Sequence, residues 1–152
     1  MLSHYDLCCL VAKKFFKREF NKFGMWNTKY VTVELCTTSS ETPDVFGFGG
    51  NFTQLFEIKT SHADFVNDKK KKWRNISEGM GEYRTYVCPT DIIKEDELPE
   101  YYGLLYYNDI NKSFSCIKRP EQQPNINRRY EILLITSVMR RENIKAQIFN
   151  YR

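Results

Sequence analysis

Residues 43–60, with the sequence PDVFGFGGNFTQLFEIKT, decide the fold of this chain. Two strand-like runs, Asp44–Phe48 and Thr53–Thr60, flank a Gly-Gly-Asn-Phe turn and predict a β-hairpin. A two-residue turn at the second glycine and the asparagine would place Asp44 directly opposite Glu57 on the neighbouring strand. We therefore expect two carboxylates side by side in this hairpin.

Such a carboxylate pair costs stability unless a cation lies between its members. Carboxylates opposite each other repel, and their oxygens suit a hard cation such as Mg²⁺. Glu57 and Lys59 are two residues apart on a strand and point to the same face. Lys59 can therefore hold a water beside a metal bound by Asp44 and Glu57, with the Ile58 carbonyl as a further oxygen ligand. Glu34, at the end of the preceding strand, can reach the same site.

These groups match what metal-assisted phosphodiester hydrolysis needs, namely a Lewis acid, an attacking water and a nearby cation. The alternative is a surface ion-pair cluster, which is common in a chain with 28% charged residues. Pattern and geometry alone leave both interpretations open.

Helical and strand-like patterns surround the hairpin. A capping box at Ser3 begins a helix that Gly24 ends, and Ser61 caps a second helix. Further strands are expected at Tyr30–Cys36, Tyr83–Cys88, Gly103–Tyr107 and Ser113–Lys118, and a closing helix from Arg128 to about Lys145.

This order predicts an α/β (α+β) fold with a central mixed sheet flanked by helices. We expect a single domain over residues 1–152, with a core at about 4–118 and a C-terminal helix at about 126–146.

The composition is that of an ordinary folded domain. Aromatic residues make up 15% of the 152 residues, which excludes a wholly disordered chain. The net charge of +4 suits an anionic partner without requiring one. The longest stretch without a charged residue, Val45–Phe56, is about half of the ~20 apolar residues that a membrane-spanning helix needs. With no signal-peptide pattern either, we expect a cytoplasmic protein without a membrane partner.

The number and spacing of the cysteines and histidines argue against disulfide bonds, a structural zinc site and a hydrolase that depends on histidine. By our interpretation, neither His4 nor His62 has the sequence spacing from a cysteine that zinc ligands show. This argues against a structural zinc site. A Ser/His/Asp or Cys/His hydrolase needs a positioned imidazole, and with two histidines the chain offers few candidates. The cysteines form no CxxC pair, and their odd number predicts reduced thiols: Cys8, Cys9, Cys36, Cys88 and Cys116.

The motifs stand in a longer order that resembles a known family. A helix and a strand ending in Glu34 precede Pro43-Asp44-Val45 and Phe56-Glu57-Ile58-Lys59, and Ser61-x-x-Asp64-Phe65-x-x-Asp68-Lys69-Lys70 opens the next helix. This order resembles the PD-(D/E)XK nuclease superfamily, and within it the small bacterial and phage members grouped with the MmcB-like DNA-repair proteins. Tyr86-Val87-Cys88-Pro89 and Ile92-Ile93 continue the resemblance, which covers residues 5 to 118.

The resemblance implies a restriction-endonuclease-like αβββαβ core in a metal-dependent nuclease of a bacterial or phage-infected cell. Such an enzyme hydrolyses DNA phosphodiester bonds in DNA repair, defence or mobile-element DNA processing. The resemblance implies Mg²⁺ or Mn²⁺ as cofactor, with Asp44 and Glu57 as ligands, Glu34 as a further acidic residue and Lys59 as the catalytic lysine. The supporting residues that it implies near the site are Ser61, Asp64 and Asp68.

A basic run directly follows the predicted catalytic strand. Lys and Arg contact DNA phosphates without reading sequence. The outer side of the second helix is therefore a candidate DNA-binding surface, and its residues are Lys69, Lys70, Lys71, Lys72 and Arg74. The alternative for this run is a solvated helix face.

Three functions stay open at this point. They are a nuclease, a non-catalytic nucleic-acid-binding or partner-binding module that keeps the nuclease fold, and a structural protein with a charged surface cluster. A homodimer or a partner protein is compatible with the first two.

Overall fold

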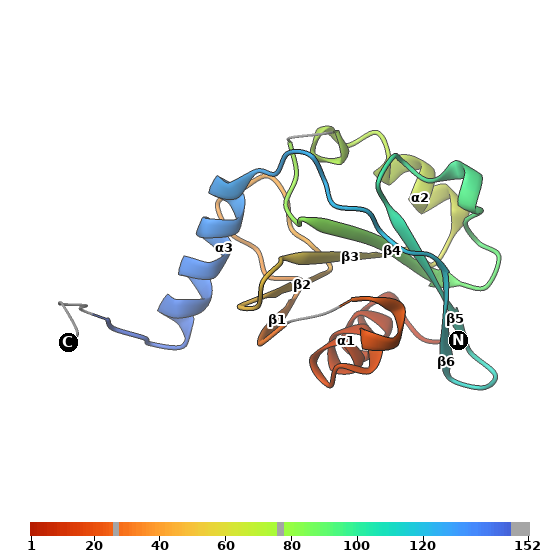
Figure 1. The fold of residues 1–152 in the computed structure, drawn as a ribbon, viewed down its shortest axis with the longest axis horizontal. Coiled ribbons are helices and arrows are strands. Elements are labelled where there is room, and N and C mark those ends of the chain that lie inside the picture. Colours follow the sequence, from red (N-terminus) through yellow and green to blue (C-terminus); the bar gives the residue numbers. More distant parts are fainter. Residues whose placement is uncertain (26–27, 76–77, 147–152) are drawn as a thin grey trace.

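The computed structural model describes residues 1–25, 28–75 and 78–146 (Figure 1). The α-helices of this part of the chain are α1 (His4–Phe16), α2 (His62–Asp68) and α3 (Arg128–Arg141). Its strands are β1 (Tyr30–Val33), β2 (Val45–Phe48), β3 (Gln54–Ile58), β4 (Tyr83–Pro89), β5 (Gly103–Asn108) and β6 (Ser113–Lys118). Short 3₁₀ helices lie at Glu19–Phe23, Lys72–Arg74 and Glu95–Glu97.

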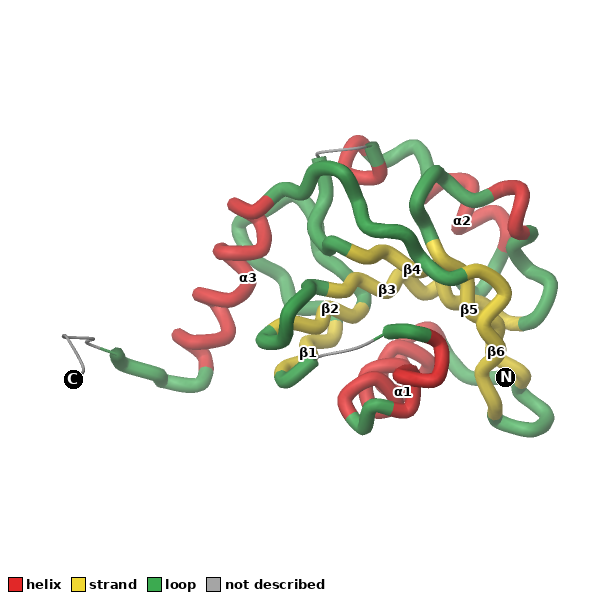
Figure 2. Tube along the Cα trace, viewed as in Figure 1, coloured by secondary structure: helices red, strands yellow, loops and turns green. Residues whose placement is uncertain are grey.

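The six strands form one open mixed sheet in the order β1-β2-β3-β4-β5-β6 (Figure 2). The pairs β3–β4 and β4–β5 are parallel, and the other neighbouring strands are antiparallel. The predicted α/β class, with a mixed sheet and flanking helices, is confirmed.

The predicted register of the β2–β3 hairpin is also confirmed. Val45 lies opposite Phe56, and Phe46 lies opposite Leu55. Continuing this register by one residue places Asp44 opposite Glu57. Strand β2 ends at Phe48 as predicted, and β3 begins at Gln54, one residue after the predicted start. The connection at 49–53 is therefore longer than a two-residue turn.

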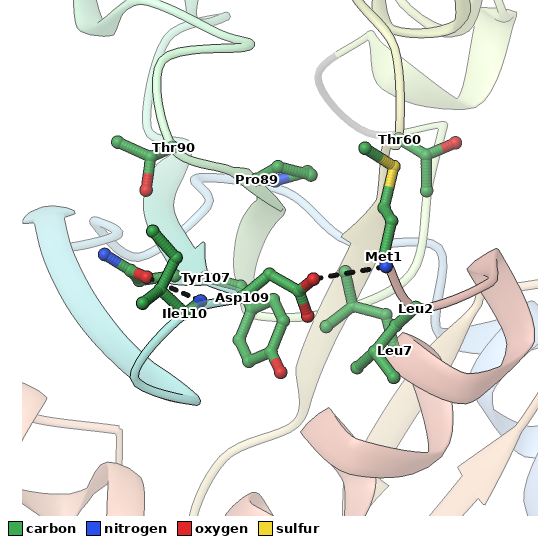
Figure 3. A pocket seen from close by; sticks show the side chains of 10 residues that line it. Met1, Leu2, Leu7, Thr60, Pro89, Thr90, Tyr107, Asp109 and Ile110 are labelled. Atoms are coloured by element: carbon green, nitrogen blue, oxygen red, sulfur yellow. Dashed lines mark hydrogen bonds and ion pairs between the residues drawn. The ribbon is translucent and has the colours of Figure 1, made fainter.

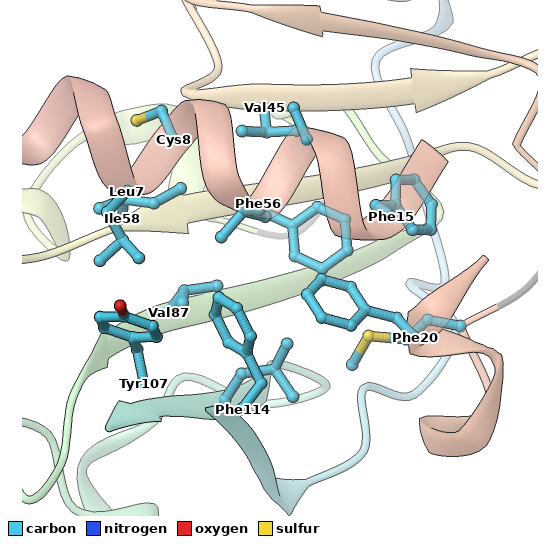
Figure 4. Close-up of a cluster of buried hydrophobic side chains, with 14 residues drawn as sticks. Leu7, Cys8, Phe15, Phe20, Val45, Phe56, Ile58, Val87, Tyr107 and Phe114 are labelled. Carbon is cyan, nitrogen blue, oxygen red and sulfur yellow. The ribbon is translucent and has the colours of Figure 1, made fainter. Parts of the chain in front are cut away.

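Helix α1 covers one face of the sheet (Figures 1 and 4). The Phe15 ring of α1 packs against Phe56 of β3 with the ring centroids 4.9 Å apart. The helix approaches β2 so closely that a Cβ atom on Gly47 would lie 2.3 Å from a Phe15 ring carbon. The buried cluster under α1 also contains Leu7, Cys8, Val11, Val45, Ile58, Val87, Leu105 and Tyr107.

The opposite face of the sheet is covered by α2 and α3, each over its own apolar cluster. Phe65 of α2 packs edge-on against Tyr86 of β4, with the ring centroids 5.0 Å apart. Leu134 of α3 is buried with Phe46 and Leu55 of the hairpin. Two helical layers thus enclose the sheet.

The helices are shorter than predicted. The first helix ends at Phe16 instead of Gly24, because Arg18 adopts a left-handed backbone conformation with φ 63°; a 3₁₀ helix then buries Phe20. Helix α2 ends at Asp68, before the lysine run. Helix α3 ends at Arg141, and Asn143 has φ 54°. None of the described helices is long and apolar enough to cross a membrane.

Candidate active site

The predicted carboxylates and lysine come together at one end of the β2–β3 hairpin. Asp44 directly precedes β2, Glu57 belongs to β3, and Lys59 directly follows β3. Lys59 Nζ lies 3.2 Å from Glu57 Oε2 and 4.0 Å from Asp44 Oδ2. Asp68, the last residue of α2, places its Oδ1 3.3 Å from the same nitrogen. We call these four residues the charged cluster.

Lys59 stays protonated in the charged cluster. Its side chain is 5% exposed, and burial by itself would lower the pKa of the ammonium group. The negative charges of Glu57, Asp68 and Asp44 outweigh burial and raise this pKa above its ordinary value. Lys59 is therefore a hydrogen-bond donor and a positive charge at neutral pH, and not a base.

Arg74 lies beneath the charged cluster and not on an exposed face. The prediction that it belongs to an exposed DNA-binding surface is wrong, because its side chain is 3% exposed. Its Nη2 lies 2.8 Å from Glu57 Oε2, and its Nε donates to Asp68 Oδ2 at 2.6 Å. The planar guanidinium presents donors in a fixed fork. Arg74 thus fixes the carboxylates of Glu57 and Asp68 from below.

Two residues that sequence reasoning missed complete this buried network. Glu41 Oε1 accepts a hydrogen bond from Arg74 Nη1 at 3.1 Å, and Glu41 Oε2 accepts one from the Met80 backbone N–H at 2.7 Å. Burial raises the pKa of Glu41 to about 7 against the opposing charge of Arg74. The Tyr86 hydroxyl donates to Asp68 Oδ2 at 2.8 Å. No local motif marks Glu41, and Tyr86 was noted only as part of the resembling stretch Tyr86-Val87-Cys88-Pro89, without a role in the site. Both residues meet their partners only through the tertiary fold.

The contacts of Arg74 and Lys59 involve only one of the two carboxylate oxygens of Glu57. Glu57 Oε1 is buried and has no hydrogen-bond partner among the described residues. Burial raises the pKa of Glu57, and the charge of Arg74 offsets only part of this effect. A buried oxygen without a partner is costly, and it is a suitable ligand for a hard cation. By donor type, the oxygens of Glu57, Asp44 and the Ile58 carbonyl are ligands that Mg²⁺ or Mn²⁺ accepts.

Asp44 also connects the charged cluster to helix α1. Its Oδ2 accepts a hydrogen bond from the Ile58 backbone N–H at 2.7 Å and lies 3.3 Å from His4 Nε2. His4 Nε2 lies 3.2 Å from the Ile58 carbonyl oxygen, and His4 Nδ1 lies 3.3 Å from Glu34 Oε1. Glu34 therefore joins the site through His4, at its solvent-exposed edge.

His4 is a site residue that sequence reasoning missed. The interpretation that no histidine lies at ligand spacing from a cysteine is wrong for His4 and Cys8, which are four residues apart on α1. Residues at this spacing share one face of a helix. Cys8 Sγ lies 3.7 Å from His4 Nδ1. The i, i+4 spacing was the signal that could have found this pair.

The predicted supporting residues Ser61 and Asp64 form the beginning of α2. The Asp64 backbone N–H donates to Ser61 Oγ at 3.2 Å, which caps the helix. Both residues are exposed, and the negative charge of Asp64 adds to the field that raises the Lys59 pKa. Asp68 is the predicted supporting residue that contacts Lys59 directly.

The four lysines after α2 have different surroundings. Lys69 Nζ donates to a backbone carbonyl at 2.9 Å, and Lys71 Nζ lies 3.2 Å from Asp68 Oδ1 at the charged cluster. Lys70 and Lys72 are exposed to solvent. Of the predicted basic surface, Lys70, Lys71 and Lys72 are exposed, and Lys71 and Lys72 already lie near the carboxylates of Asp68 and Glu78.

A pocket of about 260 Å³ is lined by residues from the start of the chain, from the segments that follow β3 and β4, and from the end of β5 (Figure 3). Thr60, which directly follows Lys59, forms one wall, and Pro89 at the end of β4 lies next to it. The amino group of Met1 lies 3.2 Å from Asp109 Oδ2 at its rim. The lining is mostly apolar and contains none of the predicted site residues.

The stability of the metal-free protein should depend on the protonation of His4. The hydrogen bond with Asp44 raises the pKa of His4 above 6.5, burial opposes this, and the charges of Asp44 and Glu34 add to it. The stabilisation is complete below about pH 6.5 and is lost as the pH rises through the folded-state pKa. With chelator present, the melting temperature of the wild type should therefore fall more steeply than that of His4→Gln as the pH rises above about 6.5. Parallel profiles would contradict this assignment.

Comparison with known proteins finds one similar fold. The solved structure of the SPO1766 protein of unknown function from Silicibacter pomeroyi is similar with a TM-score of 0.53 and 21% sequence identity. The match covers 79% of this chain and 84% of that chain. No family model and no curated protein matches the sequence. The similarity therefore concerns the fold alone.

Proposed function

We propose that this protein is a divalent-metal-dependent deoxyribonuclease with a PD-(D/E)XK-type site. The observation that carries the proposal is the position of Lys59 Nζ, within 4.0 Å of Asp44, Glu57 and Asp68. The element order α1-β1-β2-β3-α2-β4 agrees with the restriction-endonuclease-like αβββαβ core that the resemblance implies. DNA repair, defence or mobile-element DNA processing in a bacterial or phage-infected cell is the setting that we propose.

Asp44, Glu57 and the Ile58 carbonyl would hold Mg²⁺ or Mn²⁺. When bound, the cation supplies Lewis-acid stabilisation of the charge that develops on a phosphate. Glu57 Oε1, buried and without a partner among the described residues, is the donor atom that most needs such a ligand.

Lys59 has the properties of a group that orients water and stabilises negative charge. Its raised pKa keeps the ammonium protonated, so it donates hydrogen bonds to an attacking water or to a phosphate oxygen. Asp68 and Arg74 keep the ammonium and the Glu57 carboxylate in place, because their contacts leave neither group free to rotate. Preorganised charge of this kind need not rearrange during the reaction.

DNA would reach the site along the lysines that follow α2. Lys70 and Lys72 are exposed, and Lys71 joins them to Asp68 of the charged cluster. Lysines in such positions neutralise phosphates without reading base sequence. We therefore propose contacts to the DNA backbone, and the affinity should fall with rising salt concentration.

The proposal is tested by cleavage of labelled single-stranded, double-stranded and flap DNA with Mg²⁺ or Mn²⁺. We expect cleavage that disappears with chelator and returns when excess cation is added back. A folded protein that binds DNA in a salt-dependent manner but cuts no substrate would favour the non-catalytic module instead. A protein that neither binds nor cuts DNA would contradict both.

A further inference from the structure

A second set of metal-ligating side chains lies on the α1 side of Asp44. His4, Cys8, Glu34 and Asp44 each offer one donor atom, and these atoms all lie within 4.8 Å of one another. His4 and Cys8 come from one face of α1, Glu34 follows β1, and Asp44 precedes β2. Glu57 is not a member of this set, and its Oε2 contacts Arg74 and Lys59 instead. The set is thus distinct in composition from the oxygen ligands proposed for Mg²⁺.

We propose that His4, Cys8, Glu34 and Asp44 bind Zn²⁺, and that this ion competes for Asp44 with the cation of the nuclease site. The zinc site stands on its own geometry, whereas the competition rests on the proposed function. One imidazole, one thiolate and two carboxylates are ligands that zinc accepts in tetrahedral coordination.

The distances agree with a site that needs only a small contraction. In a tetrahedral zinc site, with bonds of about 2.0 Å to nitrogen or oxygen and 2.3 Å to sulfur, neighbouring donor atoms lie about 3.3 to 3.6 Å apart. His4 Nδ1 lies 3.3 Å from Glu34 Oε1 and 3.7 Å from Cys8 Sγ. On its other edge, His4 Nε2 lies 3.3 Å from Asp44 Oδ2 and 4.0 Å from Cys8 Sγ. Rotation of the imidazole selects which nitrogen binds.

The donor types select a transition metal over Mg²⁺. Thiolate and imidazole favour zinc and similar ions, whereas Mg²⁺ requires six oxygen ligands in octahedral geometry. The side chains of His4 and Glu34 are 35% and 40% exposed, while Cys8 is fully buried. An ion can therefore enter from solvent at His4 and Glu34 and reach the thiol at the bottom of the site.

Zinc binding must release protons at this site. Burial and the nearby carboxylates raise the pKa of the Cys8 thiol, so the metal-free side chain is neutral. On binding, the Cys8 proton and any proton on His4 pass to solvent, and zinc takes the thiolate and the neutral imidazole. Three anionic ligands then face one divalent ion.

Sharing of Asp44 makes zinc an inhibitor of the proposed nuclease. When Asp44 binds zinc with His4, its carboxylate is no longer free to hold Mg²⁺ with Glu57 and the Ile58 carbonyl. We expect inhibition by zinc that excess Mg²⁺ relieves, and that His4→Gln weakens.

Cobalt(II) is the probe for the zinc site, because a thiolate ligand gives Co²⁺ an intense near-ultraviolet charge-transfer band. The reduced, metal-free full chain should bind one Co²⁺ with this band, and Zn²⁺ should displace it. Cys8→Ser should abolish the band, while the neighbouring substitution Cys9→Ser should retain it. His4→Gln should lower affinity by more than the roughly 10–100-fold that loss of an outer-shell partner costs.

A folding control and one further variant separate the possible failures. Because Cys8 is buried, circular dichroism must first show that Cys8→Ser is folded. If Cys8→Ser does not fold, His4→Gln tests the site instead, because the His4 side chain is half-exposed. Glu57→Gln should retain the cobalt band, whatever its activity. The absence of the band in the wild type, or a band that survives Cys8→Ser, would overturn the zinc site. A zinc site without DNA cleavage would instead contradict only the proposed function.

Discussion

Replacing Arg74 with methionine is expected to lower the free energy of unfolding by about 3–5 kcal/mol. Arg74 is 3% exposed and contacts Glu41, Glu57 and Asp68 at 3.1, 2.8 and 2.6 Å. Methionine keeps much of the side-chain volume but removes the positive charge. Three buried carboxylates then lose their shared partner, and removal of one partner from a buried ionic network is strongly destabilising.

Chemical denaturation monitored by circular dichroism measures this effect. Arg129→Met is the matched control, because Arg129 is exposed on α3, and we expect a change within about 0.5 kcal/mol. Equal unfolding midpoints for Arg74→Met and Arg129→Met would show that the buried network contributes no net stability.

Replacing Glu57 with glutamine is expected to reduce metal-dependent DNA cleavage by at least about 100-fold, the loss typical when one preorganised electrostatic group is removed from an active site. The substitution is nearly isosteric, and the amide oxygen can still accept hydrogen bonds from Arg74 and Lys59. The carboxylate charge is lost at the position where Oε1 has no partner among the described residues. The affinity of the site for Mg²⁺ or Mn²⁺ should fall, and the negative electrostatic potential at Lys59 should weaken.

Glu97→Gln provides the matched control for the cleavage assay. Glu97 Oε1 lies 2.6 Å from His62 Nε2, and its side chain has no contact with a residue of the charged cluster among the described interactions. Its substitution should therefore leave the cleavage rate unchanged. The three proteins are purified in parallel, so that contaminating nuclease would appear equally in all of them. Equal cleavage by the wild type and Glu57→Gln would exclude Glu57 as a metal ligand of the reaction.

The hairpin and its register were predictable from sequence because they depend on local patterns. Strand periodicity and the turn between the strands place Asp44 opposite Glu57, and the structure pairs Val45 with Phe56 accordingly. The side chains of Glu57 and Lys59 point to one face because they are two residues apart. These rules require no knowledge of the remaining chain.

The surroundings of the charged cluster were not predictable in the same way. A lysine run after a capped helix has the pattern of a solvated helix face, and nothing local indicates that Arg74 turns inward. In its buried position it donates a hydrogen bond to Glu41, which lies 33 residues earlier in the chain. His4 is likewise brought to Asp44 only because α1 packs across the hairpin at Gly47. Long-range packing therefore decided the parts of the site that pattern reasoning missed.

The first turn of α1 carries the imidazole that contacts Asp44. His4 belongs to this turn, which Ser3 caps by accepting a hydrogen bond from the Asp6 backbone N–H at 3.2 Å. Terminal turns of helices fray with small opening free energies, and each opening removes the imidazole from Asp44. A cap worth about 1 kcal/mol shifts that local equilibrium roughly fivefold. Fraying of this one turn would therefore separate His4 from Asp44 and expose more of that carboxylate.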